Sequence, residues 1–346
     1  MSVVLVDWLG RGGIAQTTEA WAIELEARGI AAQVVTRPGR ELGSGAVSVR
    51  SARGHRWHIA AHHAVAEEAA RTVRELRPSA VVVQNYVVPA LERRVYAAAR
   101  SVCARVVVVV HDHRLHTWRA GTSAGLGRVL KRSDTIVAHS DFVASRIERS
   151  TGRSDVAVIP HPAQVGMLRH DRMMPEFGRA SGSADLLCGH FGVVHRRYKG
   201  GDIVGDLAAD DGSGWRFVVA GVGAETSSAS GVAVAGYLSP GLLVGLVDAT
   251  DATLLPYRAA TQSGAVVLSH LLGSVPIASA VGGIPEQIEH AVDGILVPAG
   301  ASLDAWREAL CTLRDDTYRM ELARAGVARA WRDHELFAQA VAGLVA

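Results

Sequence analysis

Residues 252–278 read ATLLPYRAATQSGAVVLSHLLGSVPIA. The stretch opens with a short apolar run, Ala252–Leu255, passes through a polar loop, and ends with a second apolar run, Val275–Ala278. Between the two runs, Ser263 and Gly264 begin an apolar segment of helical length, and serine is a favoured N-cap residue. A strand, a helix and a second strand in this order predict one unit of a parallel sheet.

The same alternation extends over most of the chain. Continuous apolar runs of four to eight residues are typical of parallel strands buried on both faces. We predict further strands at Val3–Val6, Ala32–Thr36, Ala80–Gln84, Val106–Val110, Thr135–Ala138, Val156–Ile159, Leu187–Val193, Arg216–Ala220, Val232–Ala235 and Ile295–Val297. We predict helices that include Ala15–Arg28, Ala60–Arg77, Ala90–Arg100, Leu303–Leu313, Thr317–Ala330 and Glu335–Val345. The pattern predicts an α/β protein with doubly wound sheets.

The alternation is interrupted once, between Pro160 and Ser183, where glycine, serine, methionine and arginine replace it. A chain of 346 residues is long enough for about two domains. We therefore predict a Rossmann-like domain at residues 1–162, a second at residues 183–330 and a C-terminal helical segment at residues 331–346.

Charge is unevenly distributed around a net value of +2. Residues 1–160 carry 22 basic and 14 acidic side chains, and the remainder carries 14 and 20. A basic first half favours an anionic acceptor or peripheral contact with an anionic membrane, although a solvated surface of mixed charge gives the same count. We expect no nucleic acid partner, and the oligomeric state stays open.

The cysteines and the N-terminus bear on location. Three scattered cysteines suit a reducing compartment. The first residues resemble a buried strand more than a signal peptide, and no apolar run reaches the length of a membrane span. We expect a cytoplasmic protein.

Lysine is rare, because only Lys131 and Lys199 account for lysine among 36 basic residues. Lys199 follows Arg196 and Arg197, directly after the predicted strand Leu187–Val193. A compact ammonium group beside forked guanidinium groups suits a diphosphate, whereas the alternative is a basic surface turn.

Polar residues also follow the strand Val106–Val110, where His111, Asp112 and His113 lie in a row. Open α/β sheets bind ligands at the carboxyl ends of their strands. A histidine there can exchange protons near neutral pH, although a solvated loop is the alternative. Two histidines this close together do not make a metal site.

Glycine-containing turns follow other predicted strands. Gly12 and Gly13 precede the first helix, where backbone amides can approach an anion, but the dinucleotide fingerprint is absent. Gly223 and Tyr237 each follow a strand and suit a pocket for a base, or a plain turn. Gly264 and Ala265 offer amides to an anion at the helix that Ser263 begins.

Several motifs together resemble family 4 glycosyltransferases. They are Gly12-Gly13, His111-Asp112, Ser140-Asp141-Phe142, Ile159-Pro160-His161, Tyr198-Lys199-Gly200, Leu255-Pro256-Tyr257, Gly264, Pro276, Gly282-Gly283-Ile284-Pro285-Glu286 and Asp293-Gly294-Ile295-Leu296-Val297. The resemblance implies the GT-B fold, a UDP- or GDP-sugar donor bound between the domains and a retaining transferase. It also implies no essential metal or other cofactor, and a last helix that returns to the first domain.

The resemblance, together with the strand ends, gives each candidate residue a role. Catalytic roles fall to His111, Lys199 and Arg196. Donor contacts fall to Gly13, Arg197, Gly223, Tyr237, Thr261, Gln262, Ser263, Gly264, Ala265 and Ser269. Acceptor contacts fall to Gly12, Asp112 and His113, for a small-molecule or lipid-linked hydroxyl.

The chain departs from the family pattern at two points. The family usually has two glutamates eight residues apart, and Thr261 and Ser269 occupy those positions here. Val193 stands where an arginine is common, so Arg196 or Arg197 is expected to supply that charge. A non-catalytic sugar-nucleotide-binding protein or partner subunit is therefore the main alternative. A nucleotide-sugar epimerase is weaker, and a dinucleotide oxidoreductase weakest. The lysine-poor, arginine-rich composition suggests a GC-rich bacterial genome, and natural-product and cell-envelope glycosylation are the two biosynthetic settings that we consider.

Overall fold

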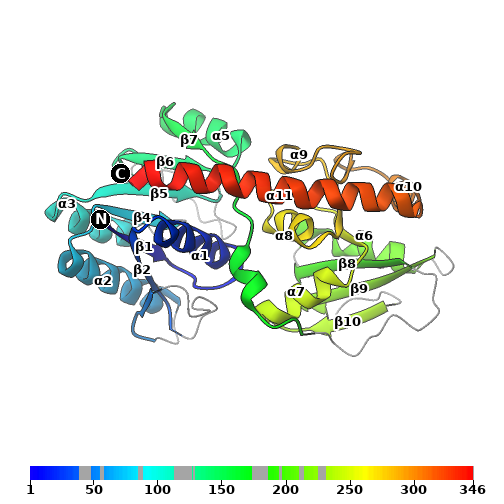
Figure 1. The fold of residues 1–346 in the computed structure, drawn as a ribbon, viewed down its shortest axis with the longest axis horizontal. Helices are drawn as coiled ribbons and strands as arrows, with labels where there is room; N and C mark the ends of the chain where they lie inside the picture. Colours follow the sequence, from blue (N-terminus) through cyan, green and yellow to red (C-terminus); the bar gives the residue numbers. More distant parts are fainter. Residues whose placement is uncertain are drawn as a thin grey trace. The chain divides into compact units, whose positions relative to one another are not determined.

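The computed structural model describes residues 1–38, 48–54, 58–84, 89–112, 127, 129–173, 186–194, 197–209, 214–224 and 231–345. It divides into two compact units (Figure 1). The first unit comprises Met1–Gly166 and His334–Ala346, and the second comprises Met167–Asp333.

The first unit is built on a parallel sheet of seven strands in the order β3-β2-β1-β4-β5-β6-β7. Its strands are β1 Ser2–Asp7, β2 Ala31–Thr36, β3 Ser48–Ser51, β4 Ala80–Gln84, β5 Arg105–Val110, β6 Thr135–Ala138 and β7 Val156–Val158. The order reverses between β1 and β4, and such a reversal is where open α/β sheets form ligand crevices.

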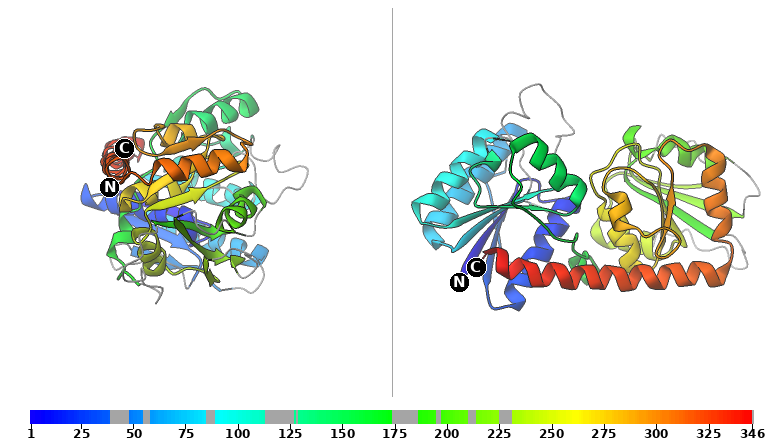
Figure 2. Two further views of the ribbon diagram at one scale, coloured as in Figure 1. Left: turned by 90° about the vertical axis from the view of Figure 1, so that its right-hand side faces the viewer. Right: turned by 90° about the horizontal axis from the view of Figure 1, so that it is seen from above.

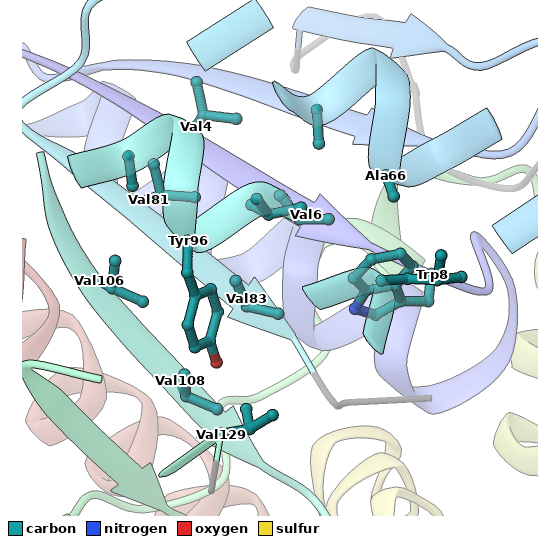
Figure 3. Packing of buried hydrophobic residues seen from close by; sticks show 14 of the residues in the cluster. Val4, Val6, Trp8, Ala66, Val81, Val83, Tyr96, Val106, Val108 and Val129 are labelled. Carbon is teal, nitrogen blue, oxygen red and sulfur yellow. The ribbon is translucent and has the colours of Figure 1, made fainter. Parts of the chain in front are cut away.

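Helices cover both faces of this sheet (Figure 2). They are α1 Gly12–Ala27, α2 His58–Leu76, α3 Pro89–Ser101 and α5 Asp141–Thr151. One face packs against α2, α3 and α5, and Figure 3 shows part of that core around Trp8 and Tyr96. The other face packs against α1 and the residues that follow His334. Valines at successive strand positions alternate between these two cores, which explains why the strands are apolar throughout.

The second unit has a parallel sheet of six strands in the order β10-β9-β8-β11-β12-β13. The strands are β8 Leu186–Val193, β9 Trp215–Val222, β10 Gly231–Ala235, β11 Ala252–Leu255, β12 Val275–Ser279 and β13 Ile295–Val297. The helices are η1 Val165–Arg169 at the unit boundary, η2 Arg197–Lys199, α6 Gly201–Ala208, α7 Pro240–Asp248, α8 Gly264–Leu272, α9 Ile284–Gln287 and α10 Leu303–Thr312. The core on one face includes α6 and α10, and the core on the other includes α7 and α8.

The predicted fold class is confirmed, and two details differ from the prediction. Strand β3 was missed because its sequence, SVRS, carries no apolar run. It is held instead by backbone pairing with β2 and by the Gln33 side chain, whose amide donates to the Ser48 carbonyl at 3.0 Å. The last two predicted helices are one helix, α11, over Asp316–Val345, because residues 331–334 contain neither glycine nor proline.

The end of α11 belongs to the core of the first unit. Phe337, Val341 and Val345 are buried there, and the Phe337 ring meets Trp21 edge to face at a centroid distance of 5.6 Å. Near the unit boundary, His334 Nε2 lies 3.2 Å from Glu24 Oε1. The boundary between the two units therefore falls within a single helix.

Candidate functional site

The candidate residues gather at the carboxyl edge of each sheet. All strands within a sheet are parallel, so the segments that follow them share one edge. In the second unit the sheet reverses order between β8 and β11, and the Lys199 turn and the Pro256–Gly264 loop follow these two strands. Their placement at the reversal makes this edge the principal candidate site of the second unit.

Backbone geometry locks the Lys199 turn onto the loop after β11. Gly200 has a φ of +69°, and a Cβ on it would lie 2.0 Å from the Pro256 carbonyl oxygen. The Arg258 amide donates to the Tyr198 carbonyl at 2.8 Å, and Arg258 Nη1 donates to the Arg197 carbonyl at 2.6 Å. The turn and the loop are therefore held as one rigid piece.

An ion pair fastens the same piece from outside. Both terminal nitrogens of Arg258 bind the carboxylate of Asp202, Nη1 at 2.9 Å from Oδ1. This contact raises the pKa of Arg258 and lowers the pKa of Asp202. Because both side chains are largely exposed, we expect the pair to contribute little to global stability and to act mainly on local order.

The Lys199 ammonium lies over an aromatic ring. Its Nζ is 3.8 Å from the centroid of Tyr257, which is buried, while Lys199 itself is half-buried. A cation at this distance from a ring face is attracted by about 0.5–2 kcal/mol, which favours one position of the flexible side chain. The Lys199 side chain is thus held over a ring face at the carboxyl edge of the second sheet.

A buried histidine lies near this lysine. His190 Nδ1 is 2.8 Å from the Leu254 carbonyl oxygen, so Nδ1 carries the proton. Burial lowers the pKa of His190 to about 4, and the positive charge of Lys199 adds to the effect. His190 is therefore neutral at physiological pH, and Lys199 supplies the charge of this region.

The start of α8 is positioned by a side chain that the sequence did not point to. The Ser263 amide donates to Gln287 Oε1 at 2.7 Å, and Gln287 Nε2 donates to the Ser263 carbonyl at 3.2 Å. Ser263 occupies the N-cap position but its hydroxyl makes no capping bond. Gly264 and Ala265, in the first turn, are half-buried. An anion at this helix start would meet amides fixed by Gln287.

The two positions aligned with the family glutamates differ in exposure. Thr261 is half-buried and its carbonyl accepts from the Gly283 amide at 3.2 Å. Gln262 is likewise half-buried. Ser269 is fully buried, and its hydroxyl donates to the Ala265 carbonyl at 2.7 Å. Ser269 thus bonds inside α8, so any part it has in donor binding would act through the helix start.

Glycines line the other strand ends of the second unit. Gly192, Gly221, Gly223 and Gly236 all have φ between +90° and +135°, and a Cβ on Gly221 would lie 1.8 Å from the Gly192 carbonyl oxygen. Next to them, the side chain of Tyr237 is 55% exposed. An apolar ring beside backbone without side chains offers a platform that a planar base would fit.

In the first unit, a turn follows β1. Asp7 Oδ1 accepts from the amides of Leu9 and Gly10, at 2.8 and 2.9 Å. Burial raises the pKa of Asp7 to about 6, and the two amides oppose this rise. Among the described residues, no atom lies within 4 Å of a Cβ built on Gly12 or Gly13, so neighbouring side chains do not crowd the backbone at the start of α1.

A row of histidines, which only partly follows the prediction, continues that edge. His111 is buried, and its Nε2 lies 2.9 Å from Gln84 Oε1. Its ring centroid is 5.4 Å from that of His139, which in turn is 5.2 Å from His161. The sequence predicted a role for His111 but none for Gln84, His139 or His161, although Gln84 ends β4 and His139 directly follows β6.

Burial keeps these imidazoles neutral. It lowers the pKa of His111 to about 3 and that of His161 to about 4, and it holds the pKa of His139 well below its usual range. Each charge in the row would also repel the next. His111 is therefore a neutral hydrogen-bonding group at physiological pH.

Some predicted residues cannot be placed in this geometry. Arg196 and His113 lie outside the described residues, whereas Asp112 is half-buried and Arg197 is exposed. In the described ranges, no three histidine, cysteine or acidic side chains gather closely enough to hold a metal ion. Over those same ranges, no helix combines the length and hydropathy of a membrane span.

Comparison with known families gives a match in each half of the chain. Residues 11–165 match the model described as Glycosyltransferase Family 4, and residues 191–316 match the model described as Glycosyl transferases group 1. No curated protein sequence matches the chain. Each half of the chain is therefore similar to a glycosyltransferase family model.

Solved structures agree in fold. Anabaena HepE in complex with UDP and glucose superposes with a TM-score of 0.78 at 16% identity, covering 99% of this chain and 100% of HepE. Sucrose-phosphate synthase from Thermosynechococcus elongatus gives 0.75 at 13% identity, with 99% and 98% covered. WaaG, a glycosyltransferase involved in lipopolysaccharide biosynthesis, gives 0.70 at 14% identity, with 99% of both chains covered. The chain thus has the two-domain GT-B fold.

Proposed function

We propose that this protein transfers a sugar from a nucleotide-sugar donor to an acceptor hydroxyl, with retention of anomeric configuration and without an essential metal. The observation that carries the proposal is the Lys199 ammonium, held over Tyr257 at the edge where the second sheet reverses its strand order. HepE is described in complex with UDP-glucose, and its likeness to this chain supports a UDP-sugar as the first donor to test.

The second unit would bind the donor through its phosphates. Breaking the bond between sugar and phosphate leaves negative charge on the diphosphate. The Lys199 ammonium and the first amides of α8 offer positive charge fixed in advance, which costs no reorganisation as that charge develops. Arg196 or Arg197 would add a forked donor.

The remaining donor contacts follow the strand ends of the same unit. Thr261, Gln262 and Ser263 would lie along the diphosphate or sugar, and Gly223 and Tyr237 would receive the base. Ser269 would act indirectly, because its hydroxyl is bonded inside α8.

The first unit would contribute His111 to the reacting sugar. Its neutral imidazole would orient a sugar hydroxyl and meet the electron-poor ring carbon without adding a positive charge, because its pKa is about 3. The leaving phosphate would take the acceptor proton on the face it departs from, which gives retention. Gly13 would contact the donor, whereas Gly12, Asp112 and His113 would border the acceptor, a small molecule or a lipid-linked hydroxyl, in the bacterial cytoplasm.

Lys199→Ala against Lys131→Ala is the sharpest test, because these are the only two lysines and Lys131 is exposed in the first unit. A thermal-shift panel of nucleotide sugars first identifies the donor, since a ligand at a hundred times its Kd stabilises the fold by about 2.7 kcal/mol. Turnover of that donor is then measured with and without acceptors.

We expect Lys199→Ala to lose about a hundredfold in kcat/KM, the usual scale for one charge-stabilising group, while Lys131→Ala retains wild-type turnover. Near-normal activity of Lys199→Ala would refute the phosphate assignment. Donor binding without turnover across a broad acceptor panel would instead favour a non-catalytic sugar-nucleotide-binding subunit, the alternative that the missing glutamates suggest.

A further inference from the structure

Three polar side chains meet at the carboxyl ends of β4, β5 and β6. Gln84 is the last residue of β4, His111 follows the last residue of β5, and His139 follows the last residue of β6. The strand register pairs Gln84 with Val109 and Val110 with Ala138, so neighbouring strands bring the three side chains to one level of the sheet edge.

Gln84 and His111 form a hydrogen bond that is shielded from water. Gln84 is fully buried, His111 is 9% exposed, and Gln84 Oε1 lies 2.9 Å from His111 Nε2. A neutral imidazole carries one proton on either ring nitrogen, and a carbonyl oxygen can only accept. The bond therefore favours the form with the proton on Nε2 and the lone pair on Nδ1.

His139 is set in the opposite sense. Its Nδ1 lies 3.2 Å from the Ile159 carbonyl oxygen, which places its proton on Nδ1. Its Nε2 is buried and has no hydrogen-bond partner among the described residues. The ring of His139, packed 5.4 Å from that of His111, limits how far the His111 ring can turn but gives Nε2 of His111 no proton acceptor.

We propose that Gln84 is a positioning residue that fixes the tautomer and ring orientation of His111, so that His111 presents Nδ1 as a hydrogen-bond acceptor. In the reaction proposed above, on which the catalytic part of this inference rests, Nδ1 would accept a hydrogen bond from a sugar hydroxyl. A hydroxyl that donates becomes more electron-rich, which favours the positive charge that develops on the sugar ring.

Nuclear magnetic resonance tests the tautomer without any substrate. Full-length protein is labelled with ¹⁵N at histidine, and the ring nitrogens are observed through long-range couplings to ring protons at pH 7.5. A His111→Asn variant identifies the His111 signals by their loss. We expect one tautomer, protonated on Nε2, in the wild type and in Gln84→Glu, because a carboxylate also accepts a hydrogen bond.

Gln84→Leu removes the acceptor and should give a mixture of both tautomers of His111. Thr36→Val is the matched control, because Thr36 ends strand β2 of the same sheet, separated from β4 by β1, and its buried hydroxyl has no partner among the described residues. This control should leave the His111 signals unchanged. A wild-type His111 protonated on Nδ1, or a tautomer unaffected by Gln84→Leu, would overturn the proposal.

Donor turnover then separates this inference from the proposed function. With the donor found in the thermal-shift panel, Gln84→Leu should lower kcat about tenfold, the scale of one hydrogen bond, with little change in KM. Gln84→Glu should keep the tautomer but shift the acid limb of the kcat–pH profile upwards, because the carboxylate stabilises protonated His111. A purely structural Gln84 would lower stability and kcat alike without moving that limb. If the wild type shows the Nε2 form but no turnover, the proposed function fails and the positioning of His111 stands.

Discussion

Gly200→Ala tests whether the close approach of the Lys199 turn to Pro256 holds the donor site together. Two costs apply to this substitution. Alanine at a φ of +69° costs about 1 kcal/mol by backbone strain alone. In addition, the new Cβ would lie 2.0 Å from the Pro256 carbonyl oxygen, so the turn and the loop must separate by more than 1 Å. Forcing backbone apart in a packed region costs roughly 1–3 kcal/mol.

The control for Gly200→Ala is Gly300→Ala. Gly300 has a φ of +72° in the same unit, and no atom of the described part of the chain lies within 4 Å of a Cβ built there. It therefore carries the strain of the left-handed conformation without the collision. We expect Gly300→Ala to cost about 1 kcal/mol and Gly200→Ala to cost about 2–4 kcal/mol.

Hydrogen–deuterium exchange followed by mass spectrometry is the suitable assay, because each unit has its own core and global unfolding need not be a single transition. Peptides that cover residues 197–209 and 252–260 should exchange faster in Gly200→Ala, since the bond from the Arg258 amide to the Tyr198 carbonyl opens. If Gly200→Ala and Gly300→Ala lost equal protection against exchange around the substituted glycine, the result would refute the idea that contact with Pro256, rather than the conformation of Gly200, orders the turn.

Three further predictions concern neighbouring features. Tyr257→Phe should leave donor binding unchanged and the free energy of unfolding equal or higher, because the buried Tyr257 hydroxyl has no partner among the described residues. Tyr257→Leu should weaken donor binding about fivefold, measured by calorimetry, because the cation–π contact with Lys199 is lost. Gly221→Ala should destabilise the second unit by more than Gly236→Ala in urea unfolding, because only the first places a Cβ against backbone, at 1.8 Å, and equal effects would contradict this. The free energy of unfolding should fall as the pH drops below about 6.5, by about 1.4 kcal/mol per pH unit for each histidine whose pKa is lowered, because the unfolded chain binds protons there that the folded chain does not. A thermal midpoint that stays constant between pH 7 and pH 5 would refute the neutral assignment of four histidines, His111, His139, His161 and His190.

Asp7 acts in the opposite direction in that titration. Its pKa is raised to about 6, so the folded chain holds a proton between about pH 4 and pH 6 that the unfolded chain has released. Its contribution to stability is present at low pH and is lost as the pH rises through 6. It offsets about one of the histidine protons and leaves the net direction unchanged.

The parallel strands were predictable because each is buried on both faces and therefore apolar along its length. Val106–Val110 and Ala252–Leu255 are examples. Strand β3 was not predictable in this way, since SVRS lies at an edge and depends on its partner strand. Local sequence therefore predicts which strands are buried better than it predicts which strands pair with one another.

The candidate site shows the same division. Lys199 and Gly264 could be chosen as candidates from the sequence, because a rare residue type and a strand–loop–helix pattern are local signals. Tyr257, Gln287 and Gln84 were not, because their roles depend on contacts with segments 24 to 58 residues away in sequence. Arg258 likewise gives no sign in sequence that it fastens the loop to Asp202.

The long helix α11 has a consequence for the order in which the protein folds. Residues 334–345 complete one face of the first unit, where Phe337 and Val341 cover Trp21 and its neighbours. During synthesis, that apolar face stays exposed to solvent until the whole second unit, Met167–Asp333, has been translated. We expect the newly synthesised first unit to be prone to aggregation and dependent on chaperones until residues 334–345 have been made. A fragment ending at Gly166 should be rescued by a peptide of residues 334–345 supplied separately.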